Sequence, residues 1–93
     1  MGKLIVTAQV QDAVKWEANF RTHGEMFKKE YALTKPVSYG VSEGNICTVC
    51  FEVDDVAAAL KAMASPATAE AMAQDGVIRE TAKFYVLEKE FKV

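Results

Sequence analysis

An aromatic stripe in the first third of the chain constrains the fold more than any other feature. Trp16, Phe20, His23, Phe27 and Tyr31 follow one another at steps of four, three, four and four residues. Side chains with this spacing share one face of a helix, which has 3.6 residues per turn. The stripe also contains the only tryptophan and the only histidine of the chain. We therefore expect a helix over residues 12–31 whose aromatic face is covered by the other elements.

The size of the chain predicts one small domain. Its 93 residues, of which 51% are hydrophobic, fit a single globular unit over residues 1–93, because domains cluster at roughly 100 to 150 residues and disordered chains are less apolar. A chain of this length buries only about 60 to 65% of its unfolded surface. Self-association would hide more of that surface, so we expect a homodimer.

Charge and hydropathy argue against two kinds of partner. The chain has 11 Lys plus Arg against 13 Asp plus Glu, and it therefore lacks the basic excess that nucleic-acid binding requires. The apolar run within residues 1–10 is too short for a secretory signal and far shorter than the ~20 residues that cross a bilayer. We expect no nucleic acid and no membrane as a partner, and a cytoplasmic location.

Alternating and helical patterns divide the chain into strands and helices. Strands are expected at residues 4–10, 37–41, 46–53 and 81–87, and helices at residues 12–31, 56–64 and 67–74. Gly24 disfavours a continuous first helix, which therefore either bends or restarts there. Capping residues support the helix boundaries: Asp12, Asp54 with Asp55, Ser65 with Pro66, and Asp75 with Gly76. Residues 88–93 alternate between charged and apolar, and we expect them to extend the last strand as an arm.

The order β-α-β-β-α-β predicts an α+β fold of the ferredoxin-like type, an antiparallel sheet with the helices on one face. The opposite face would carry Ile5, Tyr85, Leu87 and either Cys47 or Cys50. This face is more apolar than a water-exposed surface normally is, and a second copy of the sheet would cover it. We therefore expect a dimeric α+β barrel.

The two cysteines form a C-x-x-C pattern that elsewhere marks zinc or redox sites. Cys47 and Cys50 lie within an expected strand, where residues three apart point to opposite faces with Cα atoms ~10 Å apart. A disulfide requires less than about 7 Å. We therefore predict two small buried thiols in a reducing compartment and no metal site. The sequence also lacks the G-x-S-x-G, P-loop, dinucleotide-binding and H-E-x-x-H motifs.

Several short motifs together resemble the antibiotic biosynthesis monooxygenase domain of the dimeric α+β barrel superfamily. They span nearly the whole chain: Lys15-Trp16-Glu17-x-x-Phe20-x-x-His23, Phe51-Glu-Val-Asp-Asp55, Ser65-Pro66-Ala67-x-x-Glu70-Ala-Met72 and Gly76-Val77. The resemblance implies a cleft between helices and sheet in each subunit. Relatives use that cleft for cofactor-free oxygenation of phenolic or quinol substrates, haem breakdown, isomerisation or cyclisation.

The resemblance also bears on cofactors and on site residues. Haem-degrading relatives use an asparagine on the sheet and a histidine on the second helix, whereas this chain has Thr7 and Gln9 on the first strand and no histidine on the second helix. We therefore expect no cofactor. The cofactor-free oxygenases carry asparagine, tryptophan and tyrosine in the cleft, and residues of these types here are Asn19, Trp16 and Tyr39.

His23 is the strongest catalytic candidate from the residues themselves. A histidine on the sheet-facing side of a helix can accept or donate a proton near neutral pH. The alternative is a structural histidine that is hydrogen-bonded between helix and sheet. Trp16, Phe20 and Phe27 would form the walls of a ligand site or simply belong to the core, and Tyr39 would be a second proton donor or a half-buried sheet tyrosine.

Two functions therefore remain open. One is an enzyme that binds a small apolar, aromatic or polyketide-like molecule and acts as a cofactor-free monooxygenase, isomerase or cyclase. The other is a non-catalytic dimer that senses a ligand or mediates an interaction. An open pocket of about 300 Å³ or more that reaches His23 would favour the first function, and a closed seam would favour the second.

Overall fold

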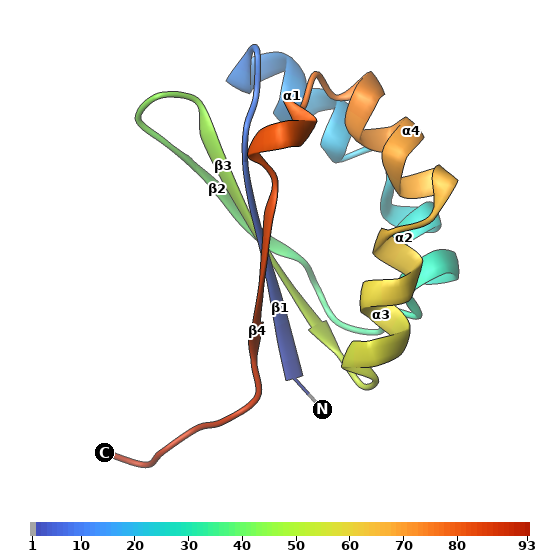
Figure 1. Ribbon diagram of the computed structural model, residues 1–93, viewed down its shortest axis with the longest axis vertical. Coiled ribbons are helices and arrows are strands. Elements are labelled where there is room, and N and C mark those ends of the chain that lie inside the picture. The colour runs from blue at the N-terminus through green and yellow to red at the C-terminus, as the bar shows by residue number, and fades with distance from the viewer. Residues whose placement is uncertain (1) are drawn as a thin grey trace.

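The chain folds into a four-stranded antiparallel sheet with helices packed on one face, as seen in the computed structural model, which describes residues 2–93 (Figure 1). The elements follow the order β1 (Gly2–Gln9), α1 (Ala13–Phe20), α2 (Gly24–Tyr31), β2 (Ser38–Ser42), β3 (Ile46–Val53), α3 (Val56–Met63), α4 (Pro66–Gln74), the 3₁₀ turn η1 (Arg79–Thr81) and β4 (Lys83–Leu87). The strand order across the sheet is β2-β3-β1-β4. The predicted ferredoxin-like α+β topology is confirmed.

The two central strands provide the floor of the core. In the register of β1 and β3, Leu4 lies opposite Phe51 and Val6 lies opposite Val49. All four side chains point toward the helices and are buried, Leu4 completely so. The alternation of buried and exposed residues along β1 and β3 follows from the pleat, which turns successive side chains to opposite faces.

The segment 12–31 forms two helices, because the chain restarts at Gly24. The carboxylate of Asp12 caps α1 by accepting hydrogen bonds from the backbone N–H groups of Val14 and Lys15, at 3.0 and 3.1 Å. Helix α1 ends at Phe20, and α2 begins at Gly24. The aromatic stripe survives this break, since its tryptophan, phenylalanine and tyrosine side chains are all buried against the sheet.

The second helical region also divides into two helices, as the capping residues predicted. Asp55 caps α3 by accepting from the backbone N–H of Ala58 at 3.0 Å, and Pro66 occupies the first turn of α4. Asp75 follows the last residue of α4, and Gly76 turns the chain with a φ of +72°. This positive φ is the conformation that favours glycine after a helix.

Within residues 2–93, no element covers the sheet face opposite the helices (Figure 1). The two cysteines point to opposite faces as predicted, and both thiols are free: Cys47 is buried on the helix side. Cys50 is only half-buried on the open side, so the prediction that both thiols are buried is wrong for Cys50. Tyr85 and Leu87 of β4 also lie on the open side, where they are 47% and 51% exposed. The open face of the sheet therefore carries exposed apolar side chains.

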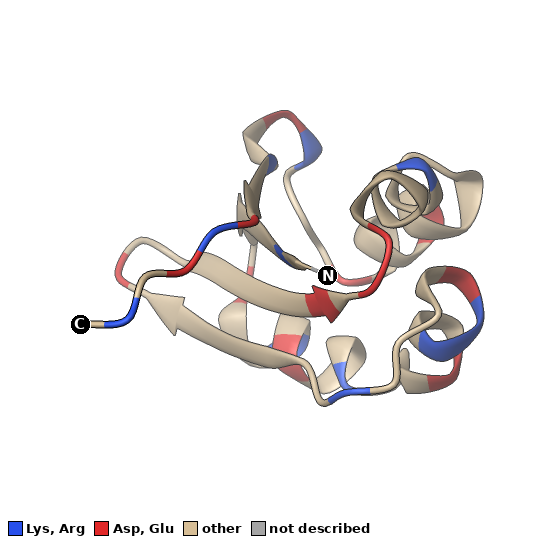
Figure 2. Cartoon of the chain, turned by 90° about the horizontal axis from the view of Figure 1, so that it is seen from below, with Lys and Arg blue, Asp and Glu red and all other residues tan. Residues whose placement is uncertain are grey.

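The C-terminal segment 88–93 leaves the globule as an extended arm without strand pairing (Figure 1). Its Phe91 is 84% exposed. Charged side chains lie mainly on the helices, the loops and this arm, and few lie on the strands (Figure 2). None of the helices in residues 2–93 combines the length and the apolar character that spanning a membrane requires.

Candidate functional site

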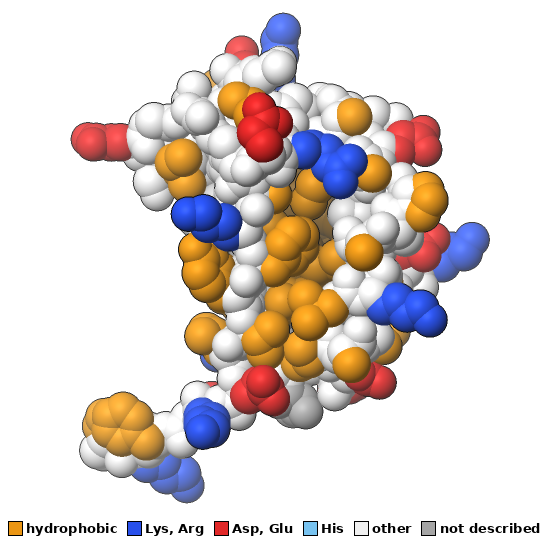
Figure 3. Space-filling model, viewed as in Figure 1, with side chains coloured by type: hydrophobic (Ala, Val, Ile, Leu, Met, Phe, Trp, Pro, Cys, Tyr) orange, Lys and Arg blue, Asp and Glu red, His pale blue; other side chains and the backbone are white. Residues whose placement is uncertain are grey.

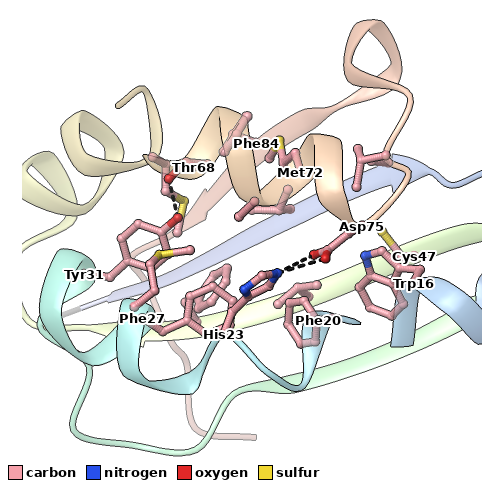
Figure 4. A pocket seen from close by; sticks show the side chains of 18 residues that line it. Trp16, Phe20, His23, Phe27, Tyr31, Cys47, Thr68, Met72, Asp75 and Phe84 are labelled. Carbon is pink, nitrogen blue, oxygen red and sulfur yellow. Dashed lines mark hydrogen bonds and ion pairs between the residues drawn. The ribbon is translucent and has the colours of Figure 1, made fainter. Parts of the chain in front are cut away.

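The side chains of His23 and Asp75 are hydrogen-bonded to each other beneath the helices. The imidazole Nε2 lies 2.8 Å from Oδ1 and 3.1 Å from Oδ2 of Asp75 (Figure 4). The two side chains are only 13% and 5% exposed. A histidine on one helical hairpin and an aspartate at the end of another thus meet across 52 residues of sequence.

Local structure places both partners at helix boundaries. His23 is the residue before α2, and its carbonyl accepts from the backbone N–H of Phe27 at 2.9 Å. Its side chain makes no capping bond and is therefore free to reach across to α4. Asp75 follows α4, and its backbone N–H donates to the carbonyl of Ala71 at 3.0 Å. The two helix termini therefore hold the pair from opposite sides.

The electrostatics of the pair follow from its burial. Burial raises the pKa of the Asp75 carboxyl above its ordinary value, and the hydrogen bond and charge of His23 oppose that rise. When Asp75 is ionised it only accepts hydrogen bonds, and Nε2 of His23 is then the donor. Nδ1 of His23 makes no hydrogen bond with the described residues, and in a neutral imidazole protonated at Nε2 it carries a lone pair that can accept a proton.

A cavity of about 60 Å³ adjoins the pair, between the helices and the sheet. Its lining is largely apolar and comes from α1, α2, α4 and the central strands (Figure 4). It has room for a few waters or a small chemical group. A pocket that encloses a drug-sized ligand typically measures about 300 Å³ or more. The cavity reaches His23, as the enzyme hypothesis requires, but it is smaller than that hypothesis predicts.

Three of the predicted ligand-binding residues line this cavity. Trp16, Phe20 and Phe27 join His23 in its wall. The rings of Trp16 and Phe20 stack with centroids 4.7 Å apart, and those of Phe20 and Phe27 are 5.3 Å apart. The indole N–H of Trp16 donates no hydrogen bond within residues 2–93, and in Figure 4 it lies on the ring edge toward Asp75.

The other two predicted site residues lie outside the cavity. The hydroxyl of Tyr39 donates to Glu17 at 2.7 Å, on the outer side of α1, and this bond raises the pKa of the Tyr39 hydroxyl. The side-chain amide of Asn19 donates to the carbonyl of Gln74 at 3.2 Å. The structure therefore places neither polar group beside His23, although the Tyr39 ring packs edge-on to Trp16 at 5.7 Å.

Sequence reasoning missed three polar residues of the cavity wall: Asp75, Thr68 and the thiol of Cys47. The hydroxyl of Tyr31 bonds to Oγ1 of Thr68, which in turn donates to the carbonyl of Ala62 at 3.2 Å. Burial raises the pKa of Tyr31 and of Cys47, and the negative charge of Asp75 adds to the rise for Cys47. Both groups therefore stay neutral, and Cys47 does not supply a thiolate.

One sequence signal could have pointed to Asp75. A carboxylate at the C-terminal end of a helix opposes the helix dipole, which favours cations there. Asp75 therefore needed a compensating partner, although the sequence alone did not indicate which residue supplies it. No comparable signal marks Thr68, which is one of several small residues in α4.

A groove of about 460 Å³ lies beside the cavity, between α3, α4 and β4. Met63, Met72 and Phe84 line both spaces. Figure 3 shows apolar side chains gathered in this hollow, next to the strand that carries Phe84. The two methionines are unbranched and flexible, so a modest rearrangement of their side chains would join the groove to the cavity. Within residues 2–93, no group of three or more His, Cys, Asp or Glu could hold a metal ion.

These features define a small α+β protein of ferredoxin-like topology with a buried His–Asp pair under its helices. Its fold is that of the antibiotic biosynthesis monooxygenase proteins, as the residue pattern predicted. One solved structure described by that name is 14% identical, with a TM-score of 0.68, and the match covers 97% of this chain and 99% of the other. At this identity the match establishes the fold.

Two further solved structures have a similar fold. A variant of SnoaB, a cofactor-independent oxygenase from Streptomyces nogalater, is 12% identical with a TM-score of 0.67, over 99% of this chain and 95% of the other. Protein Atu4242 from Agrobacterium tumefaciens is 18% identical with a TM-score of 0.65, over 97% and 94% of the two chains. No protein-family model matches the sequence, and no curated protein matches it either.

Proposed function

We propose that this protein binds a small aromatic molecule beneath its helices and oxygenates it without a cofactor, with His23 as the proton acceptor. The observation that carries the proposal is the buried contact of 2.8 Å between His23 and Asp75 beside an aromatic cavity. An ionisable pair held in such surroundings is a common feature of catalytic sites. The shared fold with a cofactor-independent oxygenase supports the same reaction class.

The proposed reaction uses the groups in stated roles. Asp75 orients the imidazole, Nδ1 of His23 removes a proton from an acidic ring methylene, and the Trp16 N–H donates to the oxyanion that forms. The resulting carbanion gives electrons to O₂. The overall change is R₂CH₂ + O₂ → R₂C=O + H₂O, in which the methylene carbon is oxidised and O₂ is reduced. The cavity walls of Phe20 and Phe27 exclude water from the charged intermediate.

The groove between α4 and β4 is the proposed entrance. An aromatic substrate is larger than the cavity of about 60 Å³, but it fits the adjoining groove of about 460 Å³. Its reactive edge would reach His23 when the side chains of Met63 and Met72 move aside. Unbranched thioether side chains adapt in this way at low cost.

The test compares the wild-type chain with His23→Gln, using anthrone as the probe. A glutamine amide can replace Nε2–H as the donor to Asp75, but it cannot act as a base. We expect His23→Gln to fold and to bind the probe, and its oxygen consumption to fall about 100-fold or more. Equal oxygen consumption by the two proteins, at matched protein and probe concentrations, would refute the role of His23.

The small volume of the cavity favours a second candidate, a non-catalytic ligand sensor or interaction dimer. In that case the His23–Asp75 pair only fastens α4 to the α1–α2 corner. A thermal-shift screen of aromatic and quinone-like compounds separates the candidates, because a ligand at 100 times its Kd adds about 2.7 kcal/mol of stability. Binding without any turnover across the compounds that bind would favour the sensor.

We also propose that the open face of the sheet pairs with a second copy. Ile5, Cys50 and Tyr85 form one row across β3, β1 and β4, since Ile5 lies opposite both of the others. A partly exposed apolar row of this kind is a typical interaction surface.

The free thiols of both cysteines suit a reducing compartment, and we propose a cytoplasmic location on that ground. Subcellular fractionation would test it.

A further inference from the structure

A second groove lies beside the α1–α2 corner, the turn of residues 21–23 between the two helices, on the side away from β4. It measures about 470 Å³ and runs between this corner and the segment 32–37 that leads into β2. Phe20, Phe27, Leu33 and Val37 contribute its apolar floor. Its volume lies within the range of small-molecule sites, about 300 to 1,000 Å³.

The rim of this groove is cationic. Arg21, Lys28 and Lys35 line it, and the carboxylate of Glu17 lies next to it, 2.7 Å from the hydroxyl of the groove-lining Tyr39. Lys28 approaches Glu25 at 3.5 Å, but both side chains are largely exposed, so the pairing is weak. The chain as a whole carries a net charge of −2. The local excess of positive charge is therefore opposite in sign to that of the whole chain.

We propose that this groove binds a small amphipathic monoanion, an aryl-alkyl carboxylate. Its ring would lie on Phe20 and Phe27, and its carboxylate would bond to Arg21 and Lys35. A guanidinium offers the planar pair of donors that a carboxylate accepts, and an ammonium adds a point charge. The apolar floor disfavours a polyanion. Several charged groups would have to give up their hydration against aromatic surface, which is costly unless each of them is paired. This site is separate from His23 and does not depend on the proposed reaction.

Phe20 and Phe27 also line the cavity beside His23, so one wall separates the two spaces. Trp16 stacks on Phe20 at 4.7 Å and meets the Tyr39 ring at 5.7 Å. A ligand on the groove side would shift these rings. The single tryptophan is therefore an intrinsic reporter of occupancy.

The experiment titrates the full chain with 4-phenylbutyrate and with its neutral amide, followed by Trp16 fluorescence and by calorimetry. We expect the carboxylate to bind about tenfold more tightly than the amide. Arg21→Gln and Lys35→Gln should each weaken carboxylate binding about threefold to fivefold, as expected for solvent-exposed charge pairs. Lys61→Gln on α3 is the matched control, since Lys61 is exposed and does not line the groove.

Several outcomes would overturn the proposal. One is equal binding of the acid and the amide, and another is an equal effect of Lys61→Gln and Lys35→Gln. A third concerns the exposed Phe91 of the C-terminal arm. If 4-phenylbutyrate binds to the Phe91→Ser variant but not to the wild-type chain, the groove is already filled by the arm of a second copy. His23→Gln should leave 4-phenylbutyrate affinity unchanged, so failure of this proposal is distinguishable from failure of the proposed oxygenase function.

Discussion

Removal of His23 should expose the free-energy cost of a buried carboxylate. His23→Ala leaves Asp75 with a side chain that is 5% exposed and without its hydrogen-bond donor. The informative comparison is between His23→Ala and the double variant His23→Ala/Asp75→Asn. The two proteins differ only by a carboxylate and a neutral amide of the same shape. Their difference in unfolding free energy therefore measures the orphaned charge alone.

The size of this difference has a ceiling set by protonation. The cost of the buried charge cannot exceed the free energy needed to protonate the carboxylate, because the protonated form carries no charge. That free energy depends on pH, and pH 7 lies about 3.2 units above the ordinary carboxyl pKa of 3.8. Each unit corresponds to about 1.36 kcal/mol, which gives a ceiling of about 4.4 kcal/mol at pH 7 and about 1.6 kcal/mol at pH 5. Leaving a buried charge without its partner typically costs about 3–5 kcal/mol. We therefore expect about 3–4 kcal/mol at pH 7.

The sign of the pH dependence follows from the raised pKa of Asp75. The folded state of His23→Ala binds more protons than the unfolded state above the ordinary carboxyl pKa, so its stability falls as pH rises through this window. The cost is absent below pH 3.8 and grows until the folded-state pKa is reached. The double variant, which lacks the carboxyl, has no such dependence from this position.

The assay is urea unfolding followed by Trp16 fluorescence, at pH 7 and pH 5. A domain of this length has a total stability of about 5–14 kcal/mol, so the single variant stays measurable. Equal stability of the single and double variants at pH 7 would refute the reasoning. A difference that did not shrink at pH 5 would show that the effect has another cause.

Three further substitutions test other parts of the structure. Thr68→Val keeps the shape of the side chain but removes the hydrogen-bond partner of the buried Tyr31 hydroxyl. It should lower the free energy of unfolding by about 1–3 kcal/mol in urea titrations. An unchanged free energy of unfolding would mean that the Tyr31 hydroxyl is hydrated instead. Gly76→Ala should cost about 1 kcal/mol in the same assay, because Gly76 has a φ of +72° while the added Cβ meets only ordinary contacts. Tyr85→Asp places a charge on the open sheet face and should convert a homodimer to monomers in light scattering, whereas an unchanged mass would mean that this face is not the interface.

Local patterns in the sequence were sufficient for the architecture. The two-residue period of β1 predicted which of its side chains face the core, and the capping residues predicted the helix boundaries to within one or two residues. In β3, which is apolar on both faces, the sequence left open whether Cys47 or Cys50 faces the core. Gly24 left two alternatives for the first helix, and the structure selected the restart. These features depend on neighbouring residues alone, so a single sequence contains the necessary information.

The last strand shows where local reasoning was less accurate. The predicted strand 81–87 begins at Lys83, because residues 79–81 form a 3₁₀ turn whose Thr81 hydroxyl bonds to the carbonyl of Ile78 at 2.6 Å and accepts from the backbone N–H of Gln9 at 2.8 Å. The bond from Gln9 joins the end of β1 to the turn that precedes β4. A tertiary partner therefore decided the start of β4 against the strand propensity of the residues.

The candidate site divides in the same way. The stripe of Trp16, Phe20, His23 and Phe27 was readable because one helical period aligns its members. The pairing of His23 with Asp75, the outward bond of Tyr39 to Glu17 and the volume of the cavity were decided only in the folded chain. Periodicity states which face of an element is apolar, but it carries no information about which residue of a distant element packs against that face, and the chemistry of this site depends on that packing.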